Sequence, residues 1–285
     1  MSGPQLLSPA SVEELDQMLA KHPGTPLLAG ATDLMPLWRR GVELPEKIIN
    51  LQKLRSELDR ITEEDRGVII GAMTNMAGLV SHPLLQENYS LLVEAAASIG
   101  ARQIQQMATL GGNLANASPS ADTVPPLLVY EAVLVLRSAA GTRELPLRSF
   151  YLDYKQMALL PGEWIRAIRL PESPSCLSFY RKTGARQAQA IAKLSMALLI
   201  GQTENELFRV AAGAMSPYPK RLSAVEDYVI QRMGDGEAIC EEEIRNILGT
   251  DLKPIDDVRS TAEYRLKVAG NILCDMIKEA GLELD

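Results

Sequence analysis

The chain has 285 residues, of which 46% are hydrophobic and 23% are charged, a composition typical of a globular protein with one large or two medium-sized domains. Its net charge of −7 argues against nucleic-acid binding. The N-terminus has no basic segment followed by an apolar core, and no apolar run reaches the roughly 18 residues of a membrane span. We therefore expect no signal peptide, no membrane span and a cytoplasmic location.

The first half of the sequence alternates between helical and strand-like patterns. Ser11 and Glu14 have the spacing of a capping box, which predicts a helix from there to about Ala20. Residues 90–100 repeat apolar side chains at the helical period. Short apolar runs bounded by turn residues predict strands at 27–29, 47–51, 68–72, 132–136 and 164–170.

The second half begins at a predicted boundary, where Pro171 and Pro174 flank two polar residues. Apolar runs beyond it predict three antiparallel strands, at 177–181, 190–201 and 208–215. Helical patterns follow at about 219–232, 237–248 and 260–280. The sequence therefore predicts an α+β protein in which a smaller C-terminal domain has a three-stranded antiparallel sheet with helices.

Two loops rich in glycine and small polar residues stand out, at 27–34 and 109–123. Gly111 and Gly112 lack a Cβ, so the backbone there could adopt an unusual φ and bring main-chain amides close to an anion. Either loop alone could be an ordinary turn. Two such loops, about 80 residues apart and each flanked by apolar segments, fit one extended ligand that is held from two sides.

The sequence has no recognisable catalytic or metal-binding pattern of its own. Cys176, Cys240 and Cys274 are widely separated, so no zinc or iron–sulfur framework is evident. His22 and His82 each precede a proline at a turn, and we expect neither a metal ligand nor a catalytic base there. The glycines match neither the P-loop nor the Rossmann pattern. Any redox chemistry must therefore come from a bound cofactor.

The two loops resemble the FAD-pyrophosphate loops of the molybdenum hydroxylase flavoprotein family, which includes the medium subunits of bacterial xanthine and carbon monoxide dehydrogenases. The resemblance extends along the whole chain, through segments 9–14, 70–74, 141–143, 161–163, 168–171, 180–182, 191–193 and 260–265. It implies a PCMH-type FAD-binding fold of two α/β subdomains, at about 1–55 and 56–172. A C-terminal flavoprotein domain would follow at 173–285.

The resemblance also implies the residues of a non-covalent FAD site. The pyrophosphate would be held by main-chain amides of both loops, Asp122 would bond the ribityl or adenosine end, and Ile99, Ile165 and Lys182 would contact the flavin ring. Asp122 could instead cap the helix after Thr123, and Lys182 could be a solvated charge at a strand end. The implied cofactor-binding residues are Leu28, Ala29, Gly30, Ala31, Thr32, Asp33, Leu34, Ile99, Thr109, Gly111, Gly112, Asn113, Asp122, Ile165 and Lys182.

The function implied by the resemblance is electron transfer within a larger enzyme. FAD would receive electrons from [2Fe–2S] clusters of a small subunit, which are reduced at the molybdenum cofactor of a large molybdopterin-binding subunit, and pass them to NAD⁺, oxygen or another acceptor. The resulting heterotrimer would often be doubled. Two alternatives remain open: a non-catalytic flavin-binding assembly protein and a free-standing flavin reductase.

The sequence departs from the family pattern at two positions. Ala31 stands where the first loop usually has a second glycine, and a positive φ there would strain the backbone. Gln105 and Gln106 stand where the family commonly has Arg-Asn. The alanine affects one expected contact with the pyrophosphate. The two glutamines alter the contacts that the family arginine makes.

Overall fold

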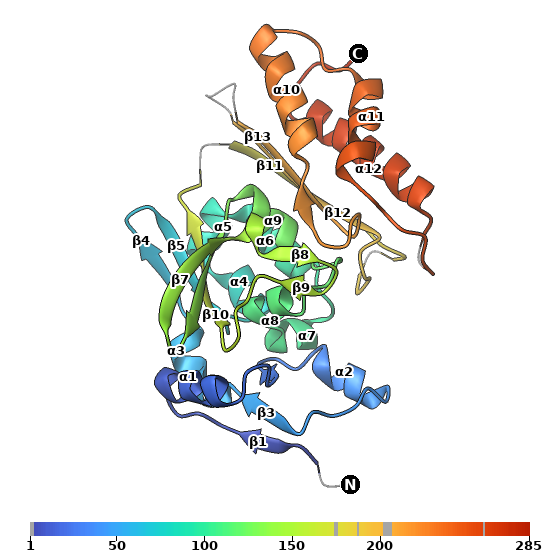
Figure 1. The fold of residues 1–285 in the computed structure, drawn as a ribbon. Helices are drawn as coiled ribbons and strands as arrows, with labels where there is room; N and C mark the ends of the chain where they lie inside the picture. The colour runs from blue at the N-terminus through green and yellow to red at the C-terminus, as the bar shows by residue number, and fades with distance from the viewer. Residues whose placement is uncertain (1–2, 174–175, 187, 202–206, 259) are drawn as a thin grey trace.

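The computed structural model describes residues 3–173, 176–186, 188–201, 207–258 and 260–285. They form an N-terminal unit, a central unit and a C-terminal unit, which follow one another along the long axis of the molecule (Figure 1). Pro174, part of the predicted boundary, lies outside the described residues. The domain limits at 172 and 173 therefore remain a prediction.

The N-terminal unit is a small parallel sheet with one main helix. Its strands, in the order β1-β3-β2, are β1 (Gln5–Leu7), β3 (Lys47–Asn50) and β2 (Leu27–Leu28). The helix α1 (Val12–Lys21) begins as the capping box predicts, because the Ser11 hydroxyl accepts from the Glu14 amide at 3.2 Å. Shorter helices follow as α2 (Leu34–Arg39) and α3 (Arg55–Leu58).

A buried carboxylate attaches α1 to the central unit. Asp16 accepts hydrogen bonds from Trp164 Nε1 and from Arg137 Nε, each at 2.8 Å. Both donors belong to the central sheet, so these two bonds fix the N-terminal unit against it. The loop that follows β2 is thereby held in a defined position relative to the central unit.

The central unit is a five-stranded antiparallel sheet covered by short helices. The strand order is β4 (Ile61–Glu64), β5 (Gly67–Gly71), β10 (Trp164–Pro171), β6 (Val133–Ser138) and β7 (Gly141–Pro146). The helices are α4 (Met76–Ser81), α5 (Pro83–Asn88), α6 (Ser90–Ala97), α7 (Arg102–Met107), α8 (Leu110–Ala115) and α9 (Val124–Val129). A small hairpin, β8 (Tyr151–Asp153) and β9 (Gln156–Met157), lies beside them (Figure 1).

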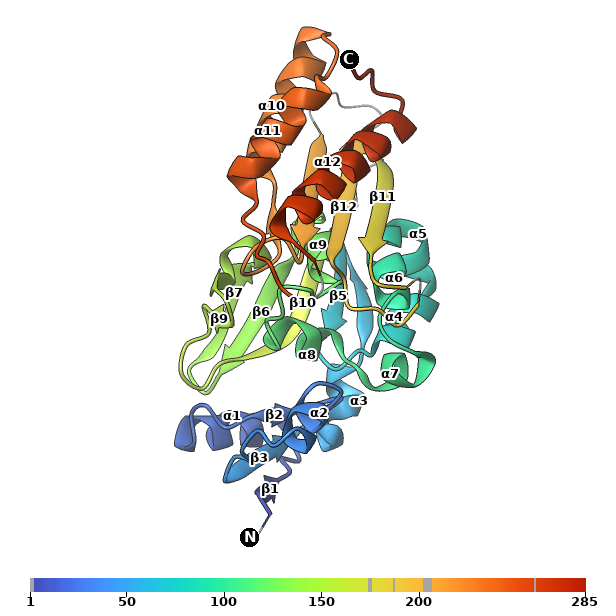
Figure 2. The same ribbon diagram turned by 90° about the vertical axis from the view of Figure 1, so that its right-hand side faces the viewer.

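The C-terminal unit has a four-stranded antiparallel sheet with three helices on one face (Figure 2). The strands are β11 (Cys176–Thr183), β12 (Leu194–Gly201), β13 (Phe208–Gly213) and β14 (Lys220–Arg221), and the helices are α10 (Ser223–Asp235), α11 (Glu241–Asp251) and α12 (Ala262–Glu279). The predicted fold class is confirmed. The short strand β14 is additional: it takes the start of the helix expected at 219–232, which begins only at Ser223.

The continuous apolar run of β12 reflects burial on both faces of the sheet. Leu194, Met196 and Leu198 belong to the core under the C-terminal helices. Ala197 and Leu199, which alternate with them, belong to the core of the central unit. The C-terminal sheet is therefore packed between its own helices and the central unit, and β11 carries side chains to the junction of the two.

Candidate functional site

The two predicted loops lie in direct contact. A Cβ on Gly30 would lie 1.9 Å from the carbonyl oxygen of Met107 and 3.1 Å from the Cα of Ala108, the residues that lead into the second loop. Only glycine permits backbones to approach this closely. Gly30 thus fits the first loop against the base of the second.

Ala31 occupies the left-handed region, with φ of 59°. The departure from the family glycine therefore lies at a position with the positive φ for which strain is expected, since a Cβ is unfavourable there. The carbonyl of Ala31 accepts from the Met35 amide at 3.0 Å, which closes the loop onto α2.

The amides of the first loop are free to bind a ligand. In the part of the chain that the structure describes, no protein acceptor pairs with the main-chain N–H groups from Gly30 to Leu34. Asp33 precedes α2 without capping it, and its side chain is exposed, whereas Thr32 is half-buried. Consecutive unpaired N–H groups in a turn with one left-handed residue form a concave donor site for an anion.

The second loop is differently built, because its amides from Leu110 to Asn113 already donate within the protein. The amides of Leu110 and Gly111 donate to the carbonyls of Thr74 and Ala72, at 2.9 and 2.8 Å. The Thr109 hydroxyl accepts from the Gly112 amide at 3.1 Å. The first loop thus offers a run of unpaired main-chain donors, whereas in the second loop the amides from Leu110 to Asn113 are bonded within the protein.

The glycines of the second loop serve close packing rather than an unusual φ. Gly111 and Gly112 lie in α8, and neither has a positive φ, which corrects the sequence-based expectation. A Cβ on Gly111 would lie 2.6 Å from the Cβ of Ala72, and one on Gly112 would lie 2.8 Å from the Thr109 hydroxyl. Asn113 follows in the same helix, and its Oδ1 accepts from Thr123 Oγ1 at 2.6 Å.

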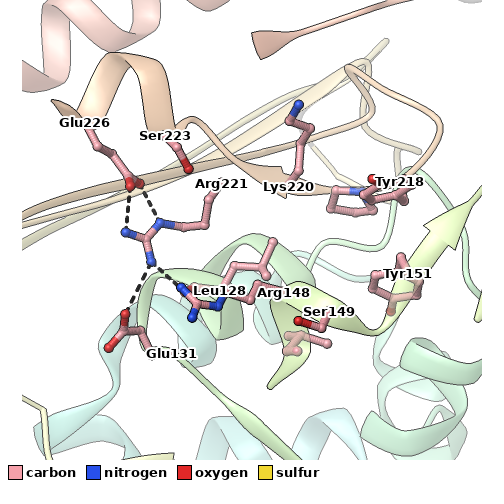
Figure 3. Close-up of a pocket in the computed structure, with 12 residues that line it drawn as sticks. Leu128, Glu131, Arg148, Ser149, Tyr151, Tyr218, Lys220, Arg221, Ser223 and Glu226 are labelled. Carbon is pink, nitrogen blue, oxygen red and sulfur yellow. Dashed lines mark hydrogen bonds and ion pairs between the residues drawn. The ribbon is translucent and has the colours of Figure 1, made fainter. Parts of the chain in front are cut away.

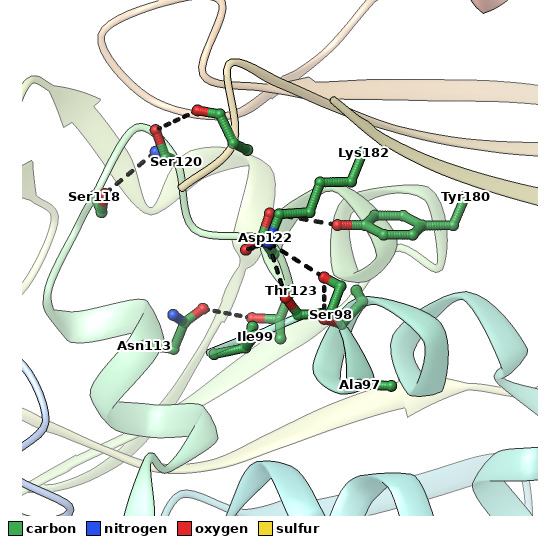
Figure 4. A network of polar contacts seen from close by, with 12 residues as sticks. Ala97, Ser98, Ile99, Asn113, Ser118, Ser120, Asp122, Thr123, Tyr180 and Lys182 are labelled. Atoms are coloured by element: carbon green, nitrogen blue, oxygen red, sulfur yellow. Dashed lines mark hydrogen bonds and ion pairs between the residues drawn. The ribbon is translucent and has the colours of Figure 1, made fainter. Parts of the chain in front are cut away.

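Asp122 and Lys182 form a buried ion pair beside the second loop (Figure 4). The Lys182 Nζ lies 2.7 Å from Asp122 Oδ2, and the Tyr180 hydroxyl donates to Oδ1 at 3.4 Å. Burial raises the pKa of the Asp122 carboxyl, and Lys182 offsets part of this rise. Burial also raises the pKa of Tyr180 well above its usual value, and the Asp122 charge adds to the effect, so the phenol stays neutral.

The ion pair shows that Asp122 is not a helix cap and that Lys182 is not a solvated charge, the two alternatives that the sequence left open. The N-cap residue of α9 is Thr123, and no side chain forms a capping hydrogen bond with this helix end. The Asp122 carboxylate instead faces the amine of Lys182. The Lys182 side chain is only 12% exposed, so it is not a solvated charge at a strand end. Tyr180 was not predicted, although residues two apart on a strand share a face and the alternation places it beside Lys182.

The two predicted flavin-contacting isoleucines belong to the central core. Ile165 on β10 is 7% exposed, and Ile99 is half-buried in the turn after α6. In Figure 4 the Ile99 side chain lies on the side of that turn facing Asn113. The turn is connected to the ion pair because Lys182 Nζ also donates to the Ser98 carbonyl at 3.0 Å. Ile99, Asn113, Asp122 and Lys182 thus lie around the turn after α6 (Figure 4).

A separate cavity of about 390 Å³ lies between α9, the β8 region and the start of α10 (Figure 3). Its wall includes Tyr151 and Tyr218, with ring centroids 6.2 Å apart, and Arg221, which pairs with Glu226. None of the predicted cofactor-binding residues lines it. The cavity belongs to the junction of the central and C-terminal units rather than to the region of the two loops.

Comparisons with known proteins agree with this architecture. A family model for the FAD binding domain in molybdopterin dehydrogenase matches residues 3–173, and one for the CO dehydrogenase flavoprotein C-terminal domain matches residues 179–280. The xanthine dehydrogenase FAD-binding subunit of Escherichia coli O157:H7 is 30% identical over 280 residues, which cover 95% of this chain and 94% of the relative. The glyceraldehyde dehydrogenase medium chain of Sulfolobus acidocaldarius is 27% identical over 270 residues, 94% and 95% of the two chains.

Solved structures give the same result. A chain of carbon monoxide dehydrogenase from Hydrogenophaga pseudoflava superimposes with a TM-score of 0.89 at 27% identity, covering 98% of this chain and 97% of that chain. The chain therefore belongs to the FAD-binding medium subunits of the molybdenum hydroxylase family, as a subunit of a xanthine dehydrogenase-like oxidoreductase. The free amides of the first loop and the close approach at Gly30 fit the anionic pyrophosphate of its FAD cofactor. Of the described helices, none is long and apolar enough to cross a membrane.

Proposed function

We propose that this chain binds one FAD non-covalently and is the electron-transfer subunit of a molybdenum-containing hydroxylase. Bound FAD supplies the redox chemistry, accepting electrons from [2Fe–2S] clusters of a partner and passing them to NAD⁺, oxygen or another acceptor. The observation that carries the proposal is the run of unpaired amides from Gly30 to Leu34, held against the second loop by the Gly30 contact.

In this proposal different groups of the chain contact different parts of an extended FAD. The unpaired amides of the first loop, from Gly30 to Leu34, bind the pyrophosphate, with Thr32 as an added hydroxyl donor. The second loop, from Thr109 to Asn113, shapes the opposite wall, because its amides from Leu110 to Asn113 are bonded within the protein. Asp122 and Lys182 supply a fixed, paired charge, and Ile99 and Ile165 supply apolar surface toward the flavin ring.

We also propose two partner subunits. These are a molybdopterin-binding large subunit and a small subunit with the [2Fe–2S] clusters, in a cytoplasmic heterotrimer that can double. The relatives are named for glyceraldehyde, xanthine and carbon monoxide, yet each matches this chain at a similar level, 27–30% identity. This similarity supports a substrate-binding site that lies outside this chain. The large subunit would then determine the substrate.

The test begins with the purified chain. The supernatant of the denatured protein should contain FAD by mass and absorption spectrum, at one per chain. Anaerobic photoreduction of the bound flavin, followed by addition of NAD⁺ or oxygen, should then restore the oxidised spectrum. FMN or no flavin after reconstitution would overturn the FAD site. A flavin that is never reoxidised would favour the non-catalytic assembly protein.

A second measurement separates the subunit from a free-standing flavin reductase. Purification from the native host should yield two further chains, one with bound molybdopterin and one with iron–sulfur absorption. A chain that elutes alone and reduces added free flavin with NADH would favour the reductase.

A further inference from the structure

Three consecutive carbonyls at the C-terminal end of α6 accept hydrogen bonds from two side chains that belong to different elements. Gln105 Nε2 donates to the carbonyl of Ala97 at 2.8 Å and to that of Ile99 at 3.0 Å. Lys182 Nζ donates to the carbonyl between them, that of Ser98, at 3.0 Å. The last carbonyls of a helix have no partner within it, so these side chains complete the hydrogen bonding of the turn.

The geometry of this turn depends on these contacts. Gly100 has φ of 52° and turns the chain into α7, which brings Gln105 back over the end of α6. A primary amide has two N–H donors, and Gln105 uses both on this turn. The neighbouring Gln106 is exposed, and the structure assigns its side chain no hydrogen bond within the described residues. Its main-chain carbonyl accepts from Asn75 Nδ2 at 2.9 Å.

We propose that Gln105 is a positioning residue for the flavin. Together with Lys182 it fixes the turn at 97–100, and this turn carries Ile99 toward the region where the flavin ring would bind. The inference rests on the proposed function, since it needs FAD in this site. It also gives a role to the departure from the family pattern: the amide keeps two donors on the carbonyls without the positive charge of an arginine.

Glutamate at this position isolates the donor role. Gln105→Glu keeps the shape of the side chain but replaces both donors by a carboxylate that faces two carbonyl oxygens. Gln106→Glu adds the same charge one residue away without loss of a contact. In fluorescence titrations of the apo-protein at fixed salt, we expect FAD to bind about tenfold more weakly to Gln105→Glu. We expect an affinity within about twofold of wild type for Gln106→Glu.

Two further variants distinguish positioning from a general loss of stability. Gln105→Met removes the donors without adding charge and should also weaken FAD binding. It therefore tests the donor role even if the glutamate variant does not fold. Gln105→Arg restores two donors and should recover the affinity. The visible circular dichroism of bound flavin should change in the methionine variant and return in the arginine variant, because it reports the surroundings of the ring.

The outcomes separate this inference from the proposed function. Wild-type protein that binds no FAD would overturn both. Wild-type protein that binds FAD, with equal affinity and flavin dichroism in Gln105→Met and Gln106→Glu, would overturn the role of Gln105 alone. Failure of Gln105→Arg to restore either signal would also contradict it, because the donors would then be irrelevant.

Discussion

Lys182 and Asp122 form an ion pair across the junction of two units, with Nζ and Oδ2 2.7 Å apart and side chains 12% and 9% exposed. Lys182 belongs to the C-terminal sheet, and Asp122 immediately precedes Thr123, the N-cap residue of α9 in the central unit. Moving two charges out of water is costly, so such a pair contributes little net stability. Removal of one partner is expensive, because the other charge stays buried and unpaired.

Lys182→Met should therefore destabilise the protein by about 3 kcal/mol, because it leaves the Asp122 carboxylate without its counter-ion. It should also loosen the turn after α6 and weaken FAD binding, since Lys182 holds the Ser98 carbonyl as well. Urea unfolding gives the first quantity, and flavin titration gives the second. Lys267→Met, at an exposed position on α12, is the control and should change neither. Equal stability of the two variants would contradict a buried pair.

Asp122 should give the stability a specific pH dependence. Its folded pKa is raised above the ordinary value of 3.8, mainly by burial, so the folded protein binds this proton more tightly than the unfolded chain does. The resulting stabilisation is fully present below pH 3.8 and is lost as the pH rises through the raised pKa. We expect the free energy of unfolding of wild type, relative to Asp122→Asn, to fall across this window. A difference that rises with pH would show a lowered pKa instead.

Gly30→Ala should disrupt the contact between the two loops. Its Cβ would meet the Met107 carbonyl at 1.9 Å, and a backbone atom cannot move aside as a side chain can. We expect a loss of about 1–3 kcal/mol in stability, from overpacking, and FAD binding at least about tenfold weaker. The matched control is Gly249→Ala in α11, where a Cβ meets open space and should increase stability slightly. Normal FAD affinity in Gly30→Ala would place the cofactor elsewhere.

Ala31→Gly tests the strain in the first loop. Glycine removes a left-handed penalty of about 1–2 kcal/mol but adds about 0.4–1 kcal/mol of backbone entropy to the unfolded chain. We expect stability to rise by up to about 1.6 kcal/mol, with FAD affinity equal or improved. Ala29→Gly, at a neighbouring position without positive φ, should only destabilise. Thermal unfolding compares the two, and a strong loss of FAD affinity in Ala31→Gly would mean that the side chain itself contacts the ligand.

The sequence predicts most of the architecture but not the pairing of its polar groups. Periodicity and capping placed α1 and three of the five strands of the central sheet, β5, β6 and β10, because those signals are local. The strands β4 and β7 were not predicted. The occupied amides of Leu110 and Gly111 depend on the carbonyls of Ala72 and Thr74, which lie far away along the chain. No local pattern shows such a partner. The strand β14 was missed for a related reason, since two residues are too few for any period.

The helix α9 connects the two regions that are matched by separate family models, because residues of the C-terminal sheet bind both of its ends. Arg221 and Arg209, from the C-terminal sheet, donate to the carbonyls of Leu128 and Val129 at one end of the helix, and Lys182 pairs with Asp122 at the other. All six residues of α9 are buried. A chain cut after residue 173 would expose this apolar helix to water and strip both of its ends of their partners. Residues 3–173 therefore depend on the C-terminal sheet and should not fold stably on their own.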